Sequence, residues 1–183
     1  MHGDQVITIE RIALLEQPII ESLHTLLSAC INQGASLGFY APAKACELAL
    51  YWKMVARDIS NNQKLLYVLY DDNEIHATVQ LALCQKQNAR HRAEVEKLLV
   101  HPGSHRQGYA SKLMAYVESD ALQQGVQLLV LDTQSGDKAE QFYHSTGYTK
   151  VGQIPYYVSD TSGQLHSTSY YYKYLAANKS SLG

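Results

Sequence analysis

The chain has 183 residues, of which 46% are hydrophobic and 17% are charged, and its formal net charge is −2. This composition is typical of an ordinary globular protein and excludes the disordered, fibrous and membrane-spanning classes. The length predicts one domain, with two very small domains as the alternative. The net charge argues against nucleic-acid binding, although it leaves room for a local basic patch that holds a phosphorylated ligand.

The cysteines and histidines predict neither a disulfide framework nor a metal site. Cys30, Cys46 and Cys84 are odd in number and widely spaced, and no two of the eight histidines form a convincing ligand spacing with a third donor. No apolar run approaches the roughly 18 residues that span a bilayer, and the N-terminus lacks the order of a signal peptide. We therefore expect a cytoplasmic protein without metal, membrane or nucleic-acid partners.

The first half of the chain predicts a strand, two helices and an antiparallel meander of three strands. The strand shows alternating apolar residues, the helices show helical apolar spacing, and a polar tetrad marks a hairpin between the first two meander strands. In order, the expected elements are a strand at 6–12, helices at 18–31 and 43–59, and strands at 64–70, 75–83 and 93–100.

The segment 33–42 is predicted to be a loop between the two helices, because Gly34 and Gly38 interrupt any regular pattern. It carries Phe39 and Tyr40, and exposed aromatic residues on a glycine-containing loop often line a ligand site. Packing at the edge of the core explains the two rings equally well. Phe39 is the candidate substrate-binding residue.

The second half predicts a helix at 109–124, a buried strand at 126–131, a helix at 138–146 and strands at 148–158 and 167–175. Strand, helix and strand in this order indicate a right-handed parallel crossover. The fold class is therefore α+β. We expect a single domain over residues 1–177, with a mixed, mostly antiparallel sheet of about seven strands, a parallel crossover at its centre and flanking helices. Residues 178–183 are predicted to be a disordered tail.

The junction between the strand 93–100 and the next helix is the strongest candidate for a ligand site. A strand that leads directly into a helix presents the free N–H groups of the first helical turn, which favour an anion such as phosphate. Gly108 lets the backbone approach such a ligand closely, although a glycine here also has a purely conformational explanation. The backbone donors are those of Arg106, Gln107, Gly108, Tyr109, Ala110 and Ser111.

This junction resembles motif A of the GNAT superfamily of N-acetyltransferases. In that motif a strand ends near Val-x-Pro, and Arg or Gln follows, then two residues, Gly, one residue, and Gly or Ala. The matching positions are Val100, Pro102, His105, Gly108 and Ala110. His105 departs from the pattern, because it stands where Arg or Gln is usual.

A second match lies on the helix after the buried strand. Ala139, Phe142, Tyr143, Gly147 and Tyr148 are similar to the family's pattern of Ala, Phe or Leu, Tyr, Gly, and Phe or Tyr. The resemblance implies the fold of the family over most of the chain.

Three further stretches resemble the tabtoxin-resistance branch, which acetylates a small amino-acid-like toxin. They are Leu83-Cys84-Gln85-Lys86, Arg92-Ala93-Glu94-Val95 and Leu131-Asp132-Thr133.

The resemblance implies acetyl-CoA as the acetyl donor. Its pyrophosphate would lie on the N–H groups of residues 106–111, with His105 beside them, and its pantetheine arm along Leu98, Leu99 and Val100. The arm carries two amides, which would bond the strand's free backbone groups like an added strand.

Acetyl transfer to an amine requires a neutral amine and a proton for the departing thiolate. In the family, the tyrosine equivalent to Tyr143 lies near the sulfur of CoA. The resemblance therefore implies that Tyr143 is the acid that protonates the departing thiolate. Glu94 lies six residues before Val100, where the histone-acetylating branch carries its catalytic glutamate. Asp132 is the second candidate base, because a carboxylate at the end of an apolar strand requires solvent or a functional partner. Alternatively, Glu94 faces solvent and Asp132 caps a turn.

We expect an N-acetyltransferase that moves acetyl to an amino group of a small amino-acid-like or toxin-like molecule by direct attack. The alternatives are acetylation of a protein N-terminus or lysine, and a catalytically silent CoA-binding sensor. An open, acidic acceptor groove would favour protein acetylation over a closed pocket lined by Phe39. The sequence neither predicts nor excludes a homodimer.

Overall fold

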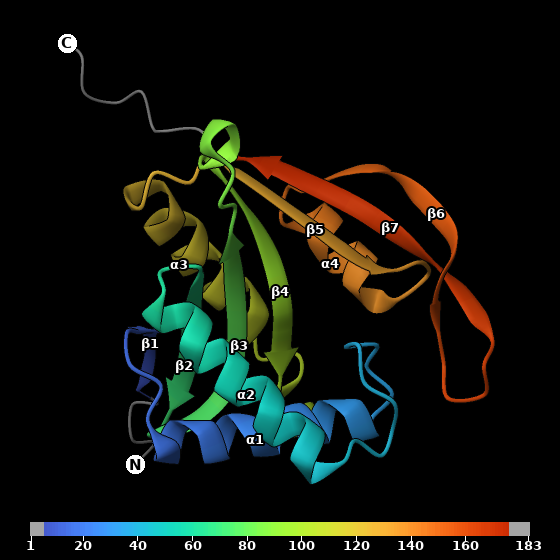
Figure 1. Ribbon diagram of the computed structural model, residues 1–183, viewed down its shortest axis with the longest axis horizontal. Coiled ribbons are helices and arrows are strands. Elements are labelled where there is room, and N and C mark those ends of the chain that lie inside the picture. Colours follow the sequence, from blue (N-terminus) through green and yellow to red (C-terminus); the bar gives the residue numbers. More distant parts are fainter. Residues whose placement is uncertain (1–5, 176–183) are drawn as a thin grey trace.

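The computed structural model describes residues 6–175, which form one mixed seven-stranded sheet with four α-helices (Figure 1). The strand order is β1-β2-β3-β4-β5-β7-β6, and only the β4–β5 pair is parallel. The predicted α+β fold is therefore confirmed, and the expected tail at 178–183 lies outside the described residues. The helices are α1 (Gln17–Asn32), α2 (Ala45–Ser60), α3 (Tyr109–Gln123) and α4 (Lys138–Ser145). The strands are β1 (Ile7–Ile12), β2 (Lys64–Asp71), β3 (Glu74–Leu83), β4 (Arg92–Val100), β5 (Leu128–Gln134), β6 (Thr149–Ser159) and β7 (Leu165–Tyr174).

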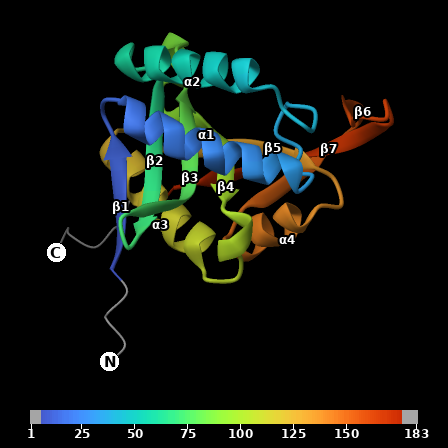
Figure 2. The same ribbon diagram turned by 90° about the horizontal axis from the view of Figure 1, so that it is seen from below.

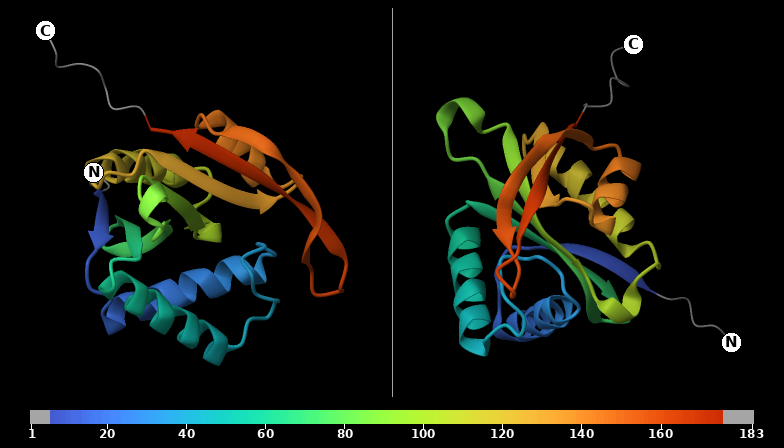
Figure 3. Two further views of the ribbon diagram at one scale, coloured as in Figure 1. Left: turned by 45° about the horizontal axis from the view of Figure 1, so that its top comes forward. Right: turned by 90° about the vertical axis from the view of Figure 1, so that its right-hand side faces the viewer.

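The sheet has a hydrophobic core on each face. Helices α1 and α2 cover one face and α3 and α4 cover the other, as the right-hand view of Figure 3 shows. Side chains of β2 alternate between the two cores: Leu66 packs with the fully buried Trp52 under α1 and α2, and Tyr67 packs with Leu113 under α3. Within residues 6–175, no helix has the length and apolar character that a membrane span requires.

Strand β5 is longer than its apolar run predicts. It continues past Leu131 to Gln134 because its backbone goes on pairing with β7, where Asp132 lies opposite Tyr170. The alternative in which Asp132 caps a turn is therefore wrong. Helix α2 also begins two residues later than predicted, since Lys44 still has an extended backbone.

Strands β4 and β5 separate after a short parallel contact. Their pairing covers only Arg92–Glu94 with Leu128–Val130, beyond which β4 stays with β3 and β5 stays with β7. The two strands therefore diverge and leave a wedge at the centre of the sheet (Figure 1). Along the wedge, β4 has no strand partner on its β5 side within the described residues.

A β-bulge interrupts β4 along this wedge. Gln80 pairs with Glu96 and Thr78 pairs with Leu99, so the single residue between them faces both Lys97 and Leu98. Lys97 has a left-handed backbone, with φ of 51°. The extra residue reverses the alternation of side chains, because Val95 packs in the α3 core whereas Leu99 packs in the α1–α2 core. Glu96 and Lys97 consequently share the α1–α2 face.

Candidate active site

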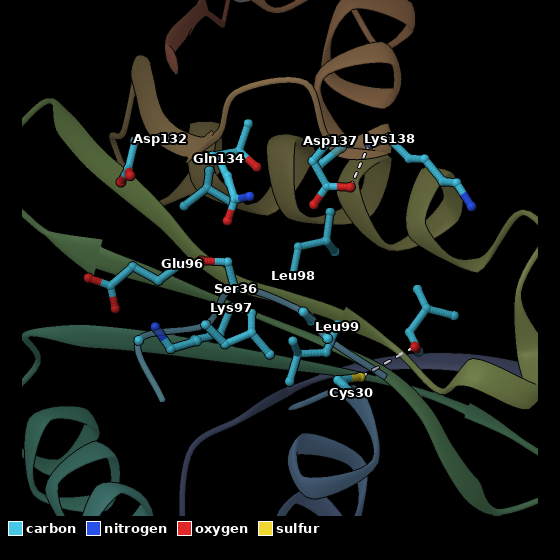
Figure 4. A pocket seen from close by; sticks show the side chains of 18 of the residues that line it. Cys30, Ser36, Glu96, Lys97, Leu98, Leu99, Asp132, Gln134, Asp137 and Lys138 are labelled. Atoms are coloured by element: carbon cyan, nitrogen blue, oxygen red, sulfur yellow. Dashed lines mark hydrogen bonds between the residues drawn. The ribbon is translucent and has the colours of Figure 1, made fainter. Parts of the chain in front are cut away.

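A pocket of about 650 Å³ occupies the wedge between β4 and β5. The loop after α1 closes it on one side, and the start of α4 and residues of β6 and β7 close it on the other. Figure 4 shows charged side chains at its two ends and Leu98 and Leu99 between them. Seven of the residues predicted from the sequence line this pocket: Glu94, Leu98, Leu99, Val100, His105, Asp132 and Tyr143.

Three carboxylates gather at one end of the pocket. Glu94 pairs in register with Val130 and therefore points to the same face as Asp132, two residues further along β5, while Glu96 follows on β4. Partial burial, together with the negative charges of Glu96 and Asp132, raises the pKa of Glu94. Burial also raises the pKa of Asp132, although the nearby Lys97 opposes the shift. Both side chains are exposed by surface area, so solvent weakens these shifts, and the direction is that each group holds a proton more readily than an isolated carboxylate.

Tyr143 on α4 lines the same pocket with a largely buried ring. The ring packs edge-on against Tyr148, with centroids 5.5 Å apart, and against Phe142 at 5.4 Å. Burial and the charge of Asp132 raise the pKa of the Tyr143 phenol, so it stays protonated at neutral pH. A protonated phenol that faces a ligand pocket is suited to donating a hydrogen bond or a proton.

Two lysines accompany the carboxylates, although the sequence analysis named neither as a site residue. Lys64 Nζ lies 2.5 Å from Glu96 Oε2 and donates to Gln80 Oε1 at 3.1 Å. Lys97 Nζ lies 5.9 Å from the centre of the Tyr51 ring, and burial lowers the pKa of its ammonium group. Glu96 was also missed as a site residue, because an unbroken strand would not have placed it beside Lys97.

The strand-to-helix turn has the geometry of an anion site. Gly108 is the N-cap of α3 with a left-handed φ of 76°, and Arg106 is also left-handed. The helix's first backbone bond, from Lys112 N–H to Gly108 O, measures 3.0 Å. The N–H groups earlier in the turn therefore have no acceptor within the helix. His105 turns back to β4, where its Nε2 lies 3.3 Å from Val100 O.

Side chains from the neighbouring strands hold this turn in place. His76 Nδ1 lies 2.7 Å from Ser104 Oγ, and the His101 N–H donates to His76 O at 2.8 Å. The Tyr109 hydroxyl donates to Asp71 at the end of β2. These bonds join the turn to β2 and β3, so the positions of its backbone donors depend on the sheet.

The loop after α1 contributes to the pocket through residues 33–38, whereas Phe39 is not among the pocket-lining residues. The Phe39 ring packs edge-on against Tyr51 at 5.5 Å, in the α1–α2 core. Tyr40 and Ser159 share a hydrogen bond of 2.6 Å, which links this loop to the β6–β7 hairpin. Figures 1 and 2 show the hairpin extending beyond the rest of the sheet toward that loop. A role for Phe39 in substrate binding stays a prediction.

Comparison with known proteins assigns the family. Residues 25–148 match the model of the acetyltransferase (GNAT) family, so the chain belongs to this family of acetyl-CoA-dependent N-acetyltransferases. Among residues 6–175, no three His, Cys, Asp or Glu side chains are grouped so as to hold a metal ion.

Solved structures share the fold at low sequence identity. An N-acetyltransferase from Staphylococcus aureus Mu50 is 13% identical with a TM-score of 0.76, and the match covers 93% of this chain and 99% of that one. The ribosomal-protein-S18-alanine N-acetyltransferase from Escherichia coli is 16% identical with a TM-score of 0.70, covering 97% and 99%. A Salmonella typhimurium protein solved with its cofactor acetyl-CoA is 14% identical with a TM-score of 0.73, covering 97% and 98%.

The residues present fit acetyl-CoA as the co-substrate of this family. The wedge exposes one edge of β4 over Leu98–Val100, and the turn at its end presents the first N–H groups of α3 beside the cations of Arg106 and Lys112. The extended pantetheine arm of acetyl-CoA would lie along this strand edge, and the pyrophosphate would lie at the turn that follows.

Proposed function

We propose that this protein acetylates an amino group of a small amino-acid-like or toxin-like molecule by direct attack on acetyl-CoA. One observation carries the proposal: Glu94, Asp132 and Tyr143, from three separate elements, line one pocket beside the free edge of β4. The resemblance to the tabtoxin-resistance branch supports a small acceptor of this kind.

The proposed chemistry needs two proton transfers. The acceptor amine loses a proton to Glu94 or Asp132 as its nitrogen forms a bond to the acetyl carbon. The carbon–sulfur bond then breaks, and the Tyr143 hydroxyl gives its proton to the departing sulfur. Solvent at the pocket mouth takes the proton from the carboxylic acid and returns one to the phenolate, so the enzyme is restored. Proton transfer by positioned groups of this kind typically accelerates a reaction about 10²- to 10⁴-fold.

The donor would be held by backbone groups. The N–H groups of residues 106–111 would bind the pyrophosphate, and Leu98, Leu99 and Val100 would pair with the amides of the pantetheine arm. His105, whose ring already contacts Val100 O, would fix the strand end between these two contacts. Acetyl-CoA supplies the activated acetyl group, and the chain supplies its position and the protons.

Protein acetylation is the second candidate function. The acidic end of the pocket favours a cationic acceptor, which a protein N-terminus or lysine side chain also provides. The similar Escherichia coli structure is named as an enzyme that acts on an alanine of a ribosomal protein. A catalytically silent CoA-binding sensor is the third reading, and the retention of Glu94, Asp132 and Tyr143 argues against it.

Thiol release from acetyl-CoA, measured across matched panels of small amines and peptides, tests the proposal. We expect small amino acids or related amines to stimulate release and to gain an acetyl group by mass spectrometry. Stimulation by peptides alone would support protein acetylation. Acetyl-CoA binding by calorimetry without stimulation by any amine would support the sensor.

A further inference from the structure

Lys97 is a pocket lysine whose charge has no close partner. The other lysine at this end, Lys64, lies 2.5 Å from Glu96 and so offsets that carboxylate. Within the described part of the chain, no carboxylate oxygen lies within 4.0 Å of Lys97 Nζ. Burial opposes its charge, while Glu96, Asp132 and Glu94 favour that charge from a longer range. A half-buried ammonium without a close ion pair loses part of its hydration, and no direct contact with a carboxylate replaces it. Its position therefore needs another explanation.

Two features of the structure hold Lys97 in this position: the bulge in β4 and the ring of Tyr51. The bulge in β4 turns its side chain to the α1–α2 face, whereas an unbroken strand would direct it into the α3 core. Beneath it lies Tyr51, whose hydroxyl exchanges hydrogen bonds of 2.8 and 3.1 Å with Gln80. Phe39 and Trp52 pack edge-on against the same ring at 5.5 and 5.1 Å. Tyr51 is thus a fixed aromatic support for the ammonium group.

The location of Lys97 separates it from the anion site of the donor. The phosphate-binding turn follows Val100 at the end of β4, whereas Lys97 lies before Leu98 and next to the carboxylates. Figure 4 shows the charged ends of Asp132, Glu96 and Lys97 together at one end of the pocket, away from Asp137 and Lys138. Lys97 is one cation beside Glu94 and Asp132, two carboxylates that form no ion pair within the described residues. This arrangement matches a ligand that carries both a positive and a negative charge.

We propose that Lys97 binds the carboxylate of a free amino-acid acceptor whose amino group is received by Glu94 and Asp132. This inference rests on the proposed function and adds the residue that selects the acceptor. A peptide N-terminus or an internal lysine has no carboxylate next to its reacting amine, so the Lys97 contact would be lost for either. The pocket therefore favours free amino acids over proteins.

Paired acceptors test the inference: each of a set of L-amino acids, including L-lysine, is compared with its own C-terminal amide. We expect the free acids to be preferred by about 10-fold or more in kcat/KM, as a charge-assisted hydrogen bond implies. Lys97→Gln should remove this preference, and Lys97→Arg should keep part of it. The KM for acetyl-CoA should stay unchanged in both variants. Lys53→Gln, on the exposed surface of α2, is the matched control and should retain the preference.

Two results would overturn the inference while leaving acetyl transfer intact. The wild-type enzyme could use the amides as well as the free acids, or Lys97→Gln could slow both members of every pair equally. The second pattern would mean that Lys97 only offsets the repulsion among the carboxylates. If acetyl-CoA binds and no amine is acetylated, the proposed function fails and the inference fails with it. Thermal unfolding of both Lys97 variants checks that they are folded.

Discussion

Tyr143 combines two properties that the chemistry requires in one residue. Its ring is fixed by the surrounding aromatic residues, and the residue lines the pocket. Because burial and Asp132 raise the pKa of the phenol, the proton is present at the pH where the amine is deprotonated. A proton donor of this kind acts on the departing sulfur and contributes little to donor binding.

Tyr143→Phe is therefore expected to lower kcat by about 10²-fold and to leave the acetyl-CoA Kd nearly unchanged. The substitution removes one oxygen and keeps the ring that packs against Tyr148. Steady-state rates and calorimetry measure the two effects separately. Tyr174→Phe, at an exposed position on β7, is the control. A wild-type rate in Tyr143→Phe would remove this residue from the mechanism.

The two carboxylates predict an activity that rises with pH. A base acts only in its deprotonated form, so the rate should increase as the pH passes the raised pKa of that group. If Glu94 is the base, Glu94→Gln should abolish this limb of the kcat/KM profile. Asp132→Asn should move it to lower pH, because the charge of Asp132 raises the pKa of Glu94.

The opposite assignment gives a different pattern in the same profiles. If Asp132 is the base, Asp132→Asn abolishes the limb and Glu94→Gln preserves it. A limb that keeps its midpoint and height in both variants would show that neither carboxylate removes the proton. Direct attack by an amine that is already neutral in solution would then account for the rate.

At the scale of the elements, the sequence predicted the four α-helices and seven strands of residues 6–175, but it missed two short 3-10 helices and the bulge. Apolar periodicity indicates elements because each one buries a face locally. The sequence holds part of the signal: the apolar residues Ala93 and Val95 occupy odd positions, whereas the apolar run Leu98–Val100 no longer alternates. A strand that changes phase in this way needs one extra residue, and Lys97 is the polar residue at the change.

The turn before α3 yields a prediction about its backbone. Gly108 has a left-handed φ of 76°, and an added Cβ would meet no atom within 4 Å, so the cost of a side chain lies in the backbone conformation alone. Gly108→Ala should lower the free energy of unfolding by about 1 kcal/mol. It should also weaken acetyl-CoA binding, since a relaxed backbone moves the N–H donors.

Gly152→Ala is the matched control for that variant, because Gly152 also has open space around its Cβ position but no left-handed φ. Thermal unfolding and calorimetry with acetyl-CoA compare the two. Equal acetyl-CoA affinity in Gly108→Ala and wild type would argue that the turn does not hold the donor through its backbone.

At the scale of the whole molecule, the site depends on pairings that join distant parts of the chain. The wedge exists because β5 leaves β4 after three residue pairs and continues with β7, about 40 residues later in the sequence. No local pattern encodes where such strands separate. The loop 33–42 was expected to line a site through Phe39, whereas its residues 33–38 line the pocket, and Lys97 was not predicted. Glu94 and Tyr143, named from motifs, and Asp132, named from its place at the end of an apolar strand, do line it.

The proposed function puts the acceptor and the donor in one pocket, so it requires both to be bound when the acetyl group moves. Initial rates measured while both substrates are varied test this central claim most directly. We predict intersecting lines in double-reciprocal plots, as a complex of the enzyme with both substrates requires. Parallel lines, with acetyl retained on the protein in the absence of acceptor, would indicate a covalent intermediate and contradict direct attack.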